Sequence, residues 1–259
     1  MAGDLGRRAL VTVLVGLAAV TAGCGAPAES RPDAAVAGRP AFVPAPSPEP
    51  VRRPAALAAS PDGRWLTARL TRPVTLRSRP GGRILARLQR RTEFGSPRVL
   101  GVVSRRSGWL EVVSSELRNQ SRGWMRAAHA DLGATNWSVH VDRSARRLVL
   151  RRSGRRVESL PVAVGRPGTP TPVGRYATTD ELHTNRPDSP YGCCIIALSG
   201  HQTRLVEGWP GGDRLAIHAT PQLESIGQAA SLGCLRAHAA DVRRMMRRLP
   251  LGTPVFVSA

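Results

Sequence analysis

The sequence has 259 residues and contains no lysine, so all 38 of its basic side chains are arginine. The formal net charge is +20. Such exclusive use of arginine indicates a compositional bias rather than selection for phosphate binding, and no recognisable nucleic-acid-binding motif accompanies the charge. We therefore expect no nucleic-acid partner, and instead a surface that attracts acidic polymers.

Cysteine is also scarce. The sequence has four cysteines, which are too few for a disulfide scaffold. Cys193 and Cys194 are adjacent, and consecutive Cα atoms lie about 3.8 Å apart. Bridged cysteines usually have Cα atoms roughly 4.4–6.8 Å apart. We therefore expect no bond between these two residues and predict two inert, buried thiols on an apolar strand.

The N-terminal apolar run, Ala9 to Val20, follows two arginines and is too short for a stop-transfer helix. It ends in Thr21-Ala22-Gly23-Cys24, which resembles a bacterial lipobox, although leucine usually occupies the position of Thr21. We predict a signal peptide over residues 1–23 and lipidation of Cys24. The protein would then be anchored at the outer face of the cytoplasmic membrane, in the cell envelope. Ordinary signal cleavage near Ala22 or Gly25 is the alternative.

Two segments precede the C-terminal half. Residues 24–62 are rich in proline and alanine, which predicts an extended, semi-rigid linker without a core. Residues 63–132 form short strand patterns separated by glycine-containing turns. Trp109 and Trp124 each follow a glycine. This segment resembles bacterial Src-homology-3-like domains, and we expect both tryptophans to pack in its core rather than stack on a ligand.

Residues 136–259 predict a third, mainly β segment. Alternating apolar residues near Val139 and Val141 indicate strands. Val242, Met245 and Leu249 have helical spacing, and Pro250 ends this one short helix. The polar, proline-broken stretch from His183 to Gly192 is typical of a lid over a cleft.

A histidine and a cysteine lie sixteen residues apart in the last segment. His218 ends a short apolar run, and Cys234 lies in a glycine-containing turn. Cysteine attacks carbonyl groups as the thiolate, so it needs a base that accepts its proton. A histidine on a strand and a cysteine in a turn can meet across a loop. The alternative is a buried thiol beside a core histidine.

Two motifs give this segment a family resemblance. Residues 218–236, with Ser231-Leu232-Gly233-Cys234-Leu235-Arg236 at their end, resemble the signature of the L,D-transpeptidase (YkuD-like) catalytic domain. The upstream turn Thr171-Pro172-Val173-Gly174-Arg175-Tyr176 resembles the Thr-Pro-x-Gly-x-aromatic element of the same family. The implied fold is mainly β: a Src-homology-3-like small barrel at residues 63–132, followed by a YkuD-like β-sandwich with one short helix at residues 136–259.

The resemblance also implies roles for individual residues. Cys234 would be the nucleophile and His218 its base, oriented by the backbone carbonyl of Ala219. Backbone amides near Gly233 and Cys234 would form an oxyanion hole, and glycine would permit the required turn. Arg236 would bind a substrate carboxylate, with a structural salt bridge as the alternative. The remaining expected substrate-binding residues are Ser231, Tyr191 and Tyr176.

By resemblance, the donor is a peptidoglycan stem tetrapeptide that ends in D-Ala, and the acceptor is a side-chain amine of a neighbouring stem. No cofactor is implied, and the spacing of His218, Cys234 and His238 does not suit zinc. The family's second histidine is Leu232 here, which predicts reduced activity. Two alternatives follow: a wall-binding lipoprotein with a degraded site, and a thiol peptidase that passes the thioester to water.

Overall fold

The computed structural model describes residues 63–186, 188–208 and 211–259. The predicted signal peptide, with Cys24, and the predicted linker lie outside this range. The described residues form seventeen strands, one α-helix and two 3-10 helices, so the predicted mainly β class is confirmed. Within these residues, every helix is too short or too polar to cross a membrane.

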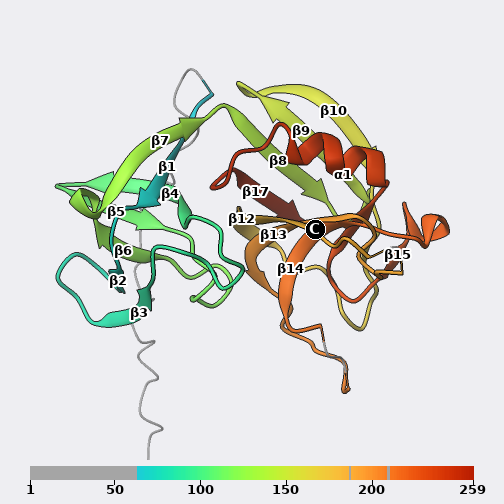
Figure 1. Ribbon diagram of the computed structural model, residues 1–259, viewed down its shortest axis with the longest axis horizontal. Helices are drawn as coiled ribbons and strands as arrows, with labels where there is room; N and C mark the ends of the chain where they lie inside the picture. The colour runs from blue at the N-terminus through green and yellow to red at the C-terminus, as the bar shows by residue number, and fades with distance from the viewer. Residues whose placement is uncertain (1–62, 187, 209–210) are drawn as a thin grey trace, which may run out of the picture. The chain divides into compact units, whose positions relative to one another are not determined.

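A seven-stranded antiparallel sheet comes first in the chain (Figure 1). Its order is β3-β2-β6-β5-β4-β1-β7. Alternating apolar side chains such as Leu76, Leu110 and Met125 fill its core and are inaccessible to solvent. The Src-homology-3-like assignment of this segment stays a prediction. The strands are β1 Trp65–Leu70, β2 Val74–Arg77, β3 Ile84–Leu88, β4 Val99–Arg106, β5 Trp109–Val112, β6 Gly123–Arg126 and β7 Ala130–Thr135, with the 3-10 helix η1 Ala127–His129 before β7.

An eight-stranded mixed sheet forms the C-terminal part, in the order β10-β9-β8-β17-β12-β13-β14-β16. A short parallel pair, β11 with β15, lies outside it, and the 3-10 helix η2 precedes β15. The bounds are β8 Trp137–Asp142, β9 Arg147–Arg152, β10 Arg155–Pro161, β11 Val164–Gly165, β12 Gly174–His183, β13 Cys194–His201, β14 Arg214–Ala219, η2 Leu223–Ser225, β15 Ala229–Ser231, β16 Leu235–Ala237 and β17 Pro254–Ser258.

Strand β12 joins two halves of this sheet. Its first residues, Gly174 to Ala177, pair with β17, whereas Thr178 to His183 pair with β13. Leu148 from one half and Ile217 from the other are both fully buried in the same apolar cluster. The halves therefore enclose one core, and β12 carries the chain from one to the other.

One α-helix, α1 (Ala239–Met246), covers the part of the sheet that includes β13 and β14 (Figure 1). Its Val242 and Met245 are fully buried in the same core cluster. Burying such a side chain contributes roughly 1.5–3 kcal/mol. The helix ends before Leu249 and Pro250, as the proline predicts.

The expectation of two free thiols at Cys193 and Cys194 is wrong, because their sulfur atoms are bonded to each other. Cys194 begins β13, but Cys193 still belongs to the preceding turn. Neighbouring side chains point to opposite faces only within a strand. In the turn, the side chain of Cys193 is free of that alternation and reaches its neighbour across the 3.8 Å between their Cα atoms.

Loops between the strands of the first sheet contact the second sheet. The hydroxyl of Thr92 donates a hydrogen bond to the buried carboxylate of Asp180 on β12. Asn119 exchanges two hydrogen bonds, of 2.6 and 2.8 Å, with the backbone of His201 at the end of β13. Glu93 forms an ion pair with Arg214, the first residue of β14. These contacts fix both ends of the β13–β14 connection.

Candidate active site

His218 lies on β14 and is almost completely buried, with 4% of its surface exposed. Its Nδ1 atom is 2.5 Å from the carbonyl oxygen of Ala219. A carbonyl oxygen only accepts hydrogen bonds, so Nδ1 carries the proton and Nε2 keeps its lone pair. The ring of Tyr191 meets the imidazole edge-on, with 5.0 Å between the ring centres. The site thus holds a histidine that is oriented to accept a proton at Nε2.

The parallel pairing of β16 with β14 brings Cys234 to the same cavity as His218. His218 pairs with Arg236 in this register, and Cys234 immediately precedes β16. Its thiol donates a hydrogen bond to the carbonyl of Arg214, with 3.8 Å between sulfur and oxygen. A cavity of about 410 Å³ is lined by both Cys234 and His218, and also by Tyr191 and Arg236. Ser231 lines the same cavity, so the structure brings five of the predicted site residues together.

Burial keeps both reacting groups neutral. Burial is the main reason that the pKa of His218 falls to about 4; the bond to Ala219 opposes this shift, and the nearby charge of Arg236 favours it. Burial also raises the pKa of the Cys234 thiol above its ordinary value, although the Ala216 backbone and Arg236 favour the thiolate. The resting pair at neutral pH is a thiol and a neutral imidazole, so the proton must move during the reaction.

The turn that carries Cys234 is held by hydrogen bonds to its backbone. Ser231 is buried, and its hydroxyl accepts from the Gly233 amide at 3.0 Å and donates to the Cys234 carbonyl at 2.6 Å. Thr171, from the upstream motif, donates to the Gly233 carbonyl at 2.8 Å. Ser231 therefore supports the turn. The expected role of the Gly233 amide in an oxyanion hole is corrected, because this amide already donates to Ser231.

Gln202 is the main site residue that the sequence did not indicate. Its side-chain nitrogen donates to the carbonyl of Leu232 at 2.8 Å, and to the carbonyls of Thr169 and Pro170 at 3.2 and 3.3 Å. A Cβ atom on Gly233 would lie 2.1 Å from this nitrogen, and Gly233 has a φ of +124°. Only glycine fits there. No local motif marks Gln202, since it is a single polar residue just after β13.

Arg236 has an incompletely satisfied guanidinium at the cavity. One terminal nitrogen donates to the side-chain oxygen of Gln222 at 2.8 Å. Its Nε is buried and has no hydrogen-bond partner among the described residues. No carboxylate in the described part of the chain forms an ion pair with it, which disfavours the alternative of a structural salt bridge. The group is suited to bind a carboxylate.

Tyr176 does not belong to this cavity, so its expected role in substrate binding is corrected. It is 2% exposed, lies in the core, and donates to the carbonyls of Pro172 and Val173 at 3.0 and 3.2 Å. The aromatic position of the Thr-Pro-x-Gly-x-aromatic turn closes that turn from inside. Burial accordingly raises the pKa of Tyr176 to about 12.

Comparison with known proteins agrees with these features. Residues 136–257 match the sequence model of the YkuD family, the L,D-transpeptidase catalytic domain. The chain therefore carries an L,D-transpeptidase catalytic domain of the YkuD family over these residues. This confirms the resemblance predicted from the two motifs.

Two curated relatives are similar over this domain. The putative L,D-transpeptidases YkuD of Bacillus subtilis and of Bacillus licheniformis are each 30% identical over 122 residues, which is 47% of this chain. The match spans 66% of the length of each relative, slightly less than two thirds. A solved L,D-transpeptidase from Mycobacterium tuberculosis is 19% identical, with a TM-score of 0.39, and the match covers 55% of this chain and 67% of that one.

Proposed function

We propose that this protein is a peptidoglycan L,D-transpeptidase that cross-links stem peptides through a thioester on Cys234. The observation that carries the proposal is the orientation of His218. Its Nδ1 is bonded to Ala219, so its basic Nε2 is available in the cavity that Cys234 also lines. A cysteine and an oriented base in one cavity are the parts that nucleophilic acyl transfer requires.

The proposed reaction has two acyl-transfer steps. His218 takes the thiol proton, and the Cys234 sulfur attacks the carbonyl carbon of the donor peptide bond. The carbon–nitrogen bond breaks, the imidazolium returns the proton to the leaving D-Ala amine, and a thioester remains. An acceptor amine then attacks the thioester carbonyl and gives its proton to His218. The Cys234 thiolate leaves and takes this proton from His218, so the thiol is regenerated and no cofactor is consumed.

Three further groups would hold the substrate. Arg236 would bind a carboxylate of the donor stem, because its buried Nε lacks a partner among the described residues. Tyr191 would cover the reacting atoms, since its ring packs on His218 at the cavity. The backbone amide of Cys234 is the remaining candidate for the oxyanion donor, a contribution worth roughly 2.7–4 kcal/mol.

The proposal includes a membrane anchor. The basic and apolar leader ends at Cys24, so the mature chain would begin with a lipidated Cys24 and face the cell wall across the linker. A Cys24→Ala variant is expected to lose both the lipid mass and the membrane fraction. Unchanged mass and unchanged fractionation would contradict the anchor without affecting the catalytic proposal.

The products formed from a donor tetrapeptide stem distinguish the proposal from both alternatives. With a diamino-acid stem as acceptor, we expect release of D-Ala and a cross-linked dimer. Release of D-Ala with hydrolysed donor alone would indicate a thiol peptidase. No turnover and no acyl-enzyme, with retained binding to isolated cell walls, would favour the wall-binding lipoprotein, for which Leu232 is the supporting feature.

A further inference from the structure

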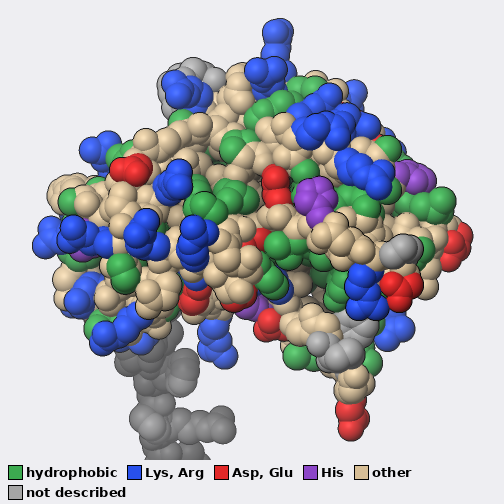
Figure 2. Space-filling model, in the orientation of Figure 1, with side chains coloured by type: hydrophobic (Ala, Val, Ile, Leu, Met, Phe, Trp, Pro, Cys, Tyr) green, Lys and Arg blue, Asp and Glu red, His purple; other side chains and the backbone are tan. Residues whose placement is uncertain are grey.

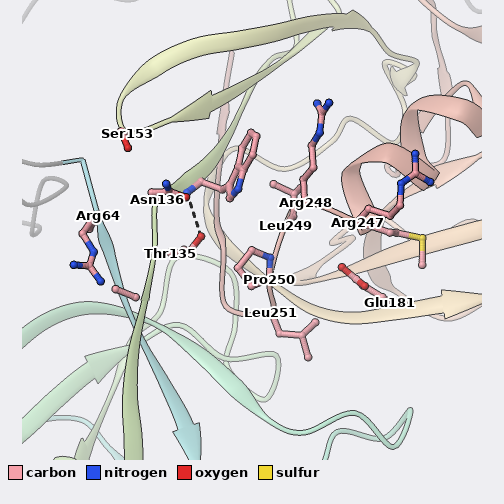
Figure 3. A pocket seen from close by; sticks show the side chains of 13 residues that line it. Arg64, Thr135, Asn136, Ser153, Glu181, Arg247, Arg248, Leu249, Pro250 and Leu251 are labelled. Atoms are coloured by element: carbon pink, nitrogen blue, oxygen red, sulfur yellow. Dashed lines mark hydrogen bonds between the residues drawn. The ribbon is translucent and has the colours of Figure 1, made fainter.

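A second cavity, of about 810 Å³, lies apart from the cysteine cavity and is larger than it. None of the site residues described above lines it. Its walls come mainly from residues 134–137, which link the two large sheets, and from residues 246–251, at and after the end of α1. Figure 3 shows Asn136 on one side and Arg247 and Glu181 on the other.

This cavity opens on the opposite face of the sheet from Cys234. Glu181 of β12 pairs with Ile196 of β13, which pairs with Ile217 of β14. Paired residues point to the same face, and successive residues along a strand alternate. Glu181 therefore shares the face of Ile217, which packs against α1, whereas His218 points the other way. The second cavity is not an extension of the catalytic one.

The cavity is lined by planar polar groups and by an aromatic ring. Glu181 is half-buried, and no described residue forms an ion pair or hydrogen bond with its carboxylate. This partial burial raises the pKa of Glu181 to about 7. The amide of Asn136, the guanidinium of Arg247 and the indole of Trp137 line the same space. Aromatic rings with a few oriented donors and acceptors suit the apolar faces and hydroxyl groups of sugars.

Uncompensated arginines adjoin the cavity on the β9–β10 hairpin. Arg152 pairs with Trp137 on one side and lies directly opposite Arg155 on the other, so these two exposed arginines share the face of Trp137. The exposed Arg151 and Arg156 also lie opposite each other, but they point to the other face. Like charges that face each other across strands destabilise a sheet. The only acidic residue in residues 147–161 is Glu158, whose carboxylate is already paired with two arginines of the α1 region. This arrangement favours an anionic ligand.

The hairpin is continuous with the cavity. The guanidinium of Arg152 lies 5.5 Å from the ring centre of Trp137, and Ser153 lines the cavity itself. In the orientation of Figure 1, β9, β10 and α1 lie at the upper right, and Figure 2 shows basic side chains gathered there with few acidic ones. A ligand bound at Trp137 would therefore meet this positive surface.

We propose that the cavity beside Trp137, together with Arg152 and Arg155 of the β9–β10 hairpin, forms a binding site for an anionic glycan of the cell wall. Sugar rings would occupy the cavity, and their carboxylate or phosphate groups would bind the arginines. Only the cell-wall origin of the glycan rests on the proposed function. Because the cavity faces away from Cys234, the site would hold the protein on one strand while the other face acts on a second strand.

Binding of soluble glycan fragments, prepared from purified cell walls, tests the proposal with the full-length chain. Arg247→Ala combined with Asn136→Ala is expected to raise the Kd about tenfold, as the loss of a charge-assisted and a neutral hydrogen bond predicts. Arg243→Ala is the matched control for charge, because Arg243 is exposed on the same helix but does not line the cavity. It should change the Kd less than twofold, and all variants should keep the melting temperature.

The ligand's anionic groups are either the carboxylates of the glycan or the phosphates of an attached polymer. Fragments from which phosphate-bearing polymers have been removed distinguish these two sources. Retained binding assigns the ligand to the carboxylate-bearing glycan, and lost binding assigns it to the phosphate-bearing polymer. Equal weakening by Arg243→Ala and by the cavity variant, or equally tight binding of a DNA fragment, would overturn the proposal in favour of general attraction between charges. Cys234→Ala should bind the glycan normally, so glycan binding without any transfer activity would reject only the proposed function.

Discussion

The Nδ1 atom of His218 lies 2.5 Å from the carbonyl oxygen of Ala219, the next residue in the chain. This bond determines which imidazole nitrogen holds the proton, and it leaves the other nitrogen available as a base. The contribution comes from the backbone of Ala219, so the side chain at this position only has to fit the core, where it is fully buried.

The low pKa of His218 predicts a pH-dependent stability. Above pH 6.5 the histidine is neutral in both the folded and the unfolded chain and contributes nothing. Between pH 6.5 and about 4 the unfolded chain binds a proton that the folded protein does not, so stability falls as the pH falls. Between pH 7 and 4.5 this loss is about 2–3 kcal/mol.

Urea unfolding of wild type and of His218→Gln at these two pH values measures the effect. Glutamine retains a donor for the Ala219 carbonyl but does not titrate. The variant should therefore lose about 2–3 kcal/mol less than wild type between pH 7 and 4.5. An equal loss in both proteins would show that His218 does not carry the effect.

Loss of the Gln202 side-chain amide should slow catalysis, because this residue lines the cysteine cavity and holds the turn that carries Cys234. Gln202→Leu would leave the Leu232 carbonyl without its donor and loosen the turn that carries Cys234. A buried carbonyl that loses its partner costs about 1–3 kcal/mol, so acylation should slow by roughly ten- to a hundredfold if the turn shifts.

Leu232→Ala is the matched control for Gln202→Leu, because it changes the side chain of Leu232 but keeps the backbone carbonyl. Acylation rates of both variants, measured at a saturating concentration of a carbapenem, separate the loss of the hydrogen bond to the Leu232 carbonyl from the change of the Leu232 side chain. A normal rate in Gln202→Leu would refute the positioning role of this residue.

Leu232 occupies the position of the family's second histidine, and it also lines the cysteine cavity. Leucine offers no hydrogen bond to a reacting group, whereas a single placed donor is worth roughly 2.7–4 kcal/mol. Leu232→His should therefore speed acylation of Cys234, by up to about a hundred- to a thousandfold. Stopped-flow measurement of acylation compares the two proteins, and an unchanged rate would show that another group already supplies the donor.

The sequence predicted the fold class because its strands alternate and its single helix has a clear period. His218 and Cys234 were found through a short motif, because such a motif depends only on the types and the order of residues along the chain. The disulfide between Cys193 and Cys194 was missed because a turn, rather than a strand, holds Cys193. Gln202 was missed because its three carbonyl partners lie about thirty residues away in the chain.

Burial explains the remaining differences between prediction and structure. Tyr176 shares a motif with Thr171, yet its ring is buried and only Thr171 contacts the turn of Cys234. Ser231 directs its hydroxyl to the backbone on both sides of it, so it supports the turn. A sequence motif does not distinguish such residues, and only the fold shows that Tyr176 lies away from the cavity, whereas Ser231 both lines it and supports the turn.

The mass of the intact protein after reaction with a carbapenem tests the central claim most directly. Wild type should gain the mass of one ring-opened carbapenem on Cys234, His218→Gln should gain it much more slowly, and Cys234→Ala should not gain it at all. An adduct that persists in Cys234→Ala, or a folded wild type that never forms one, would contradict the account of Cys234 as the nucleophile.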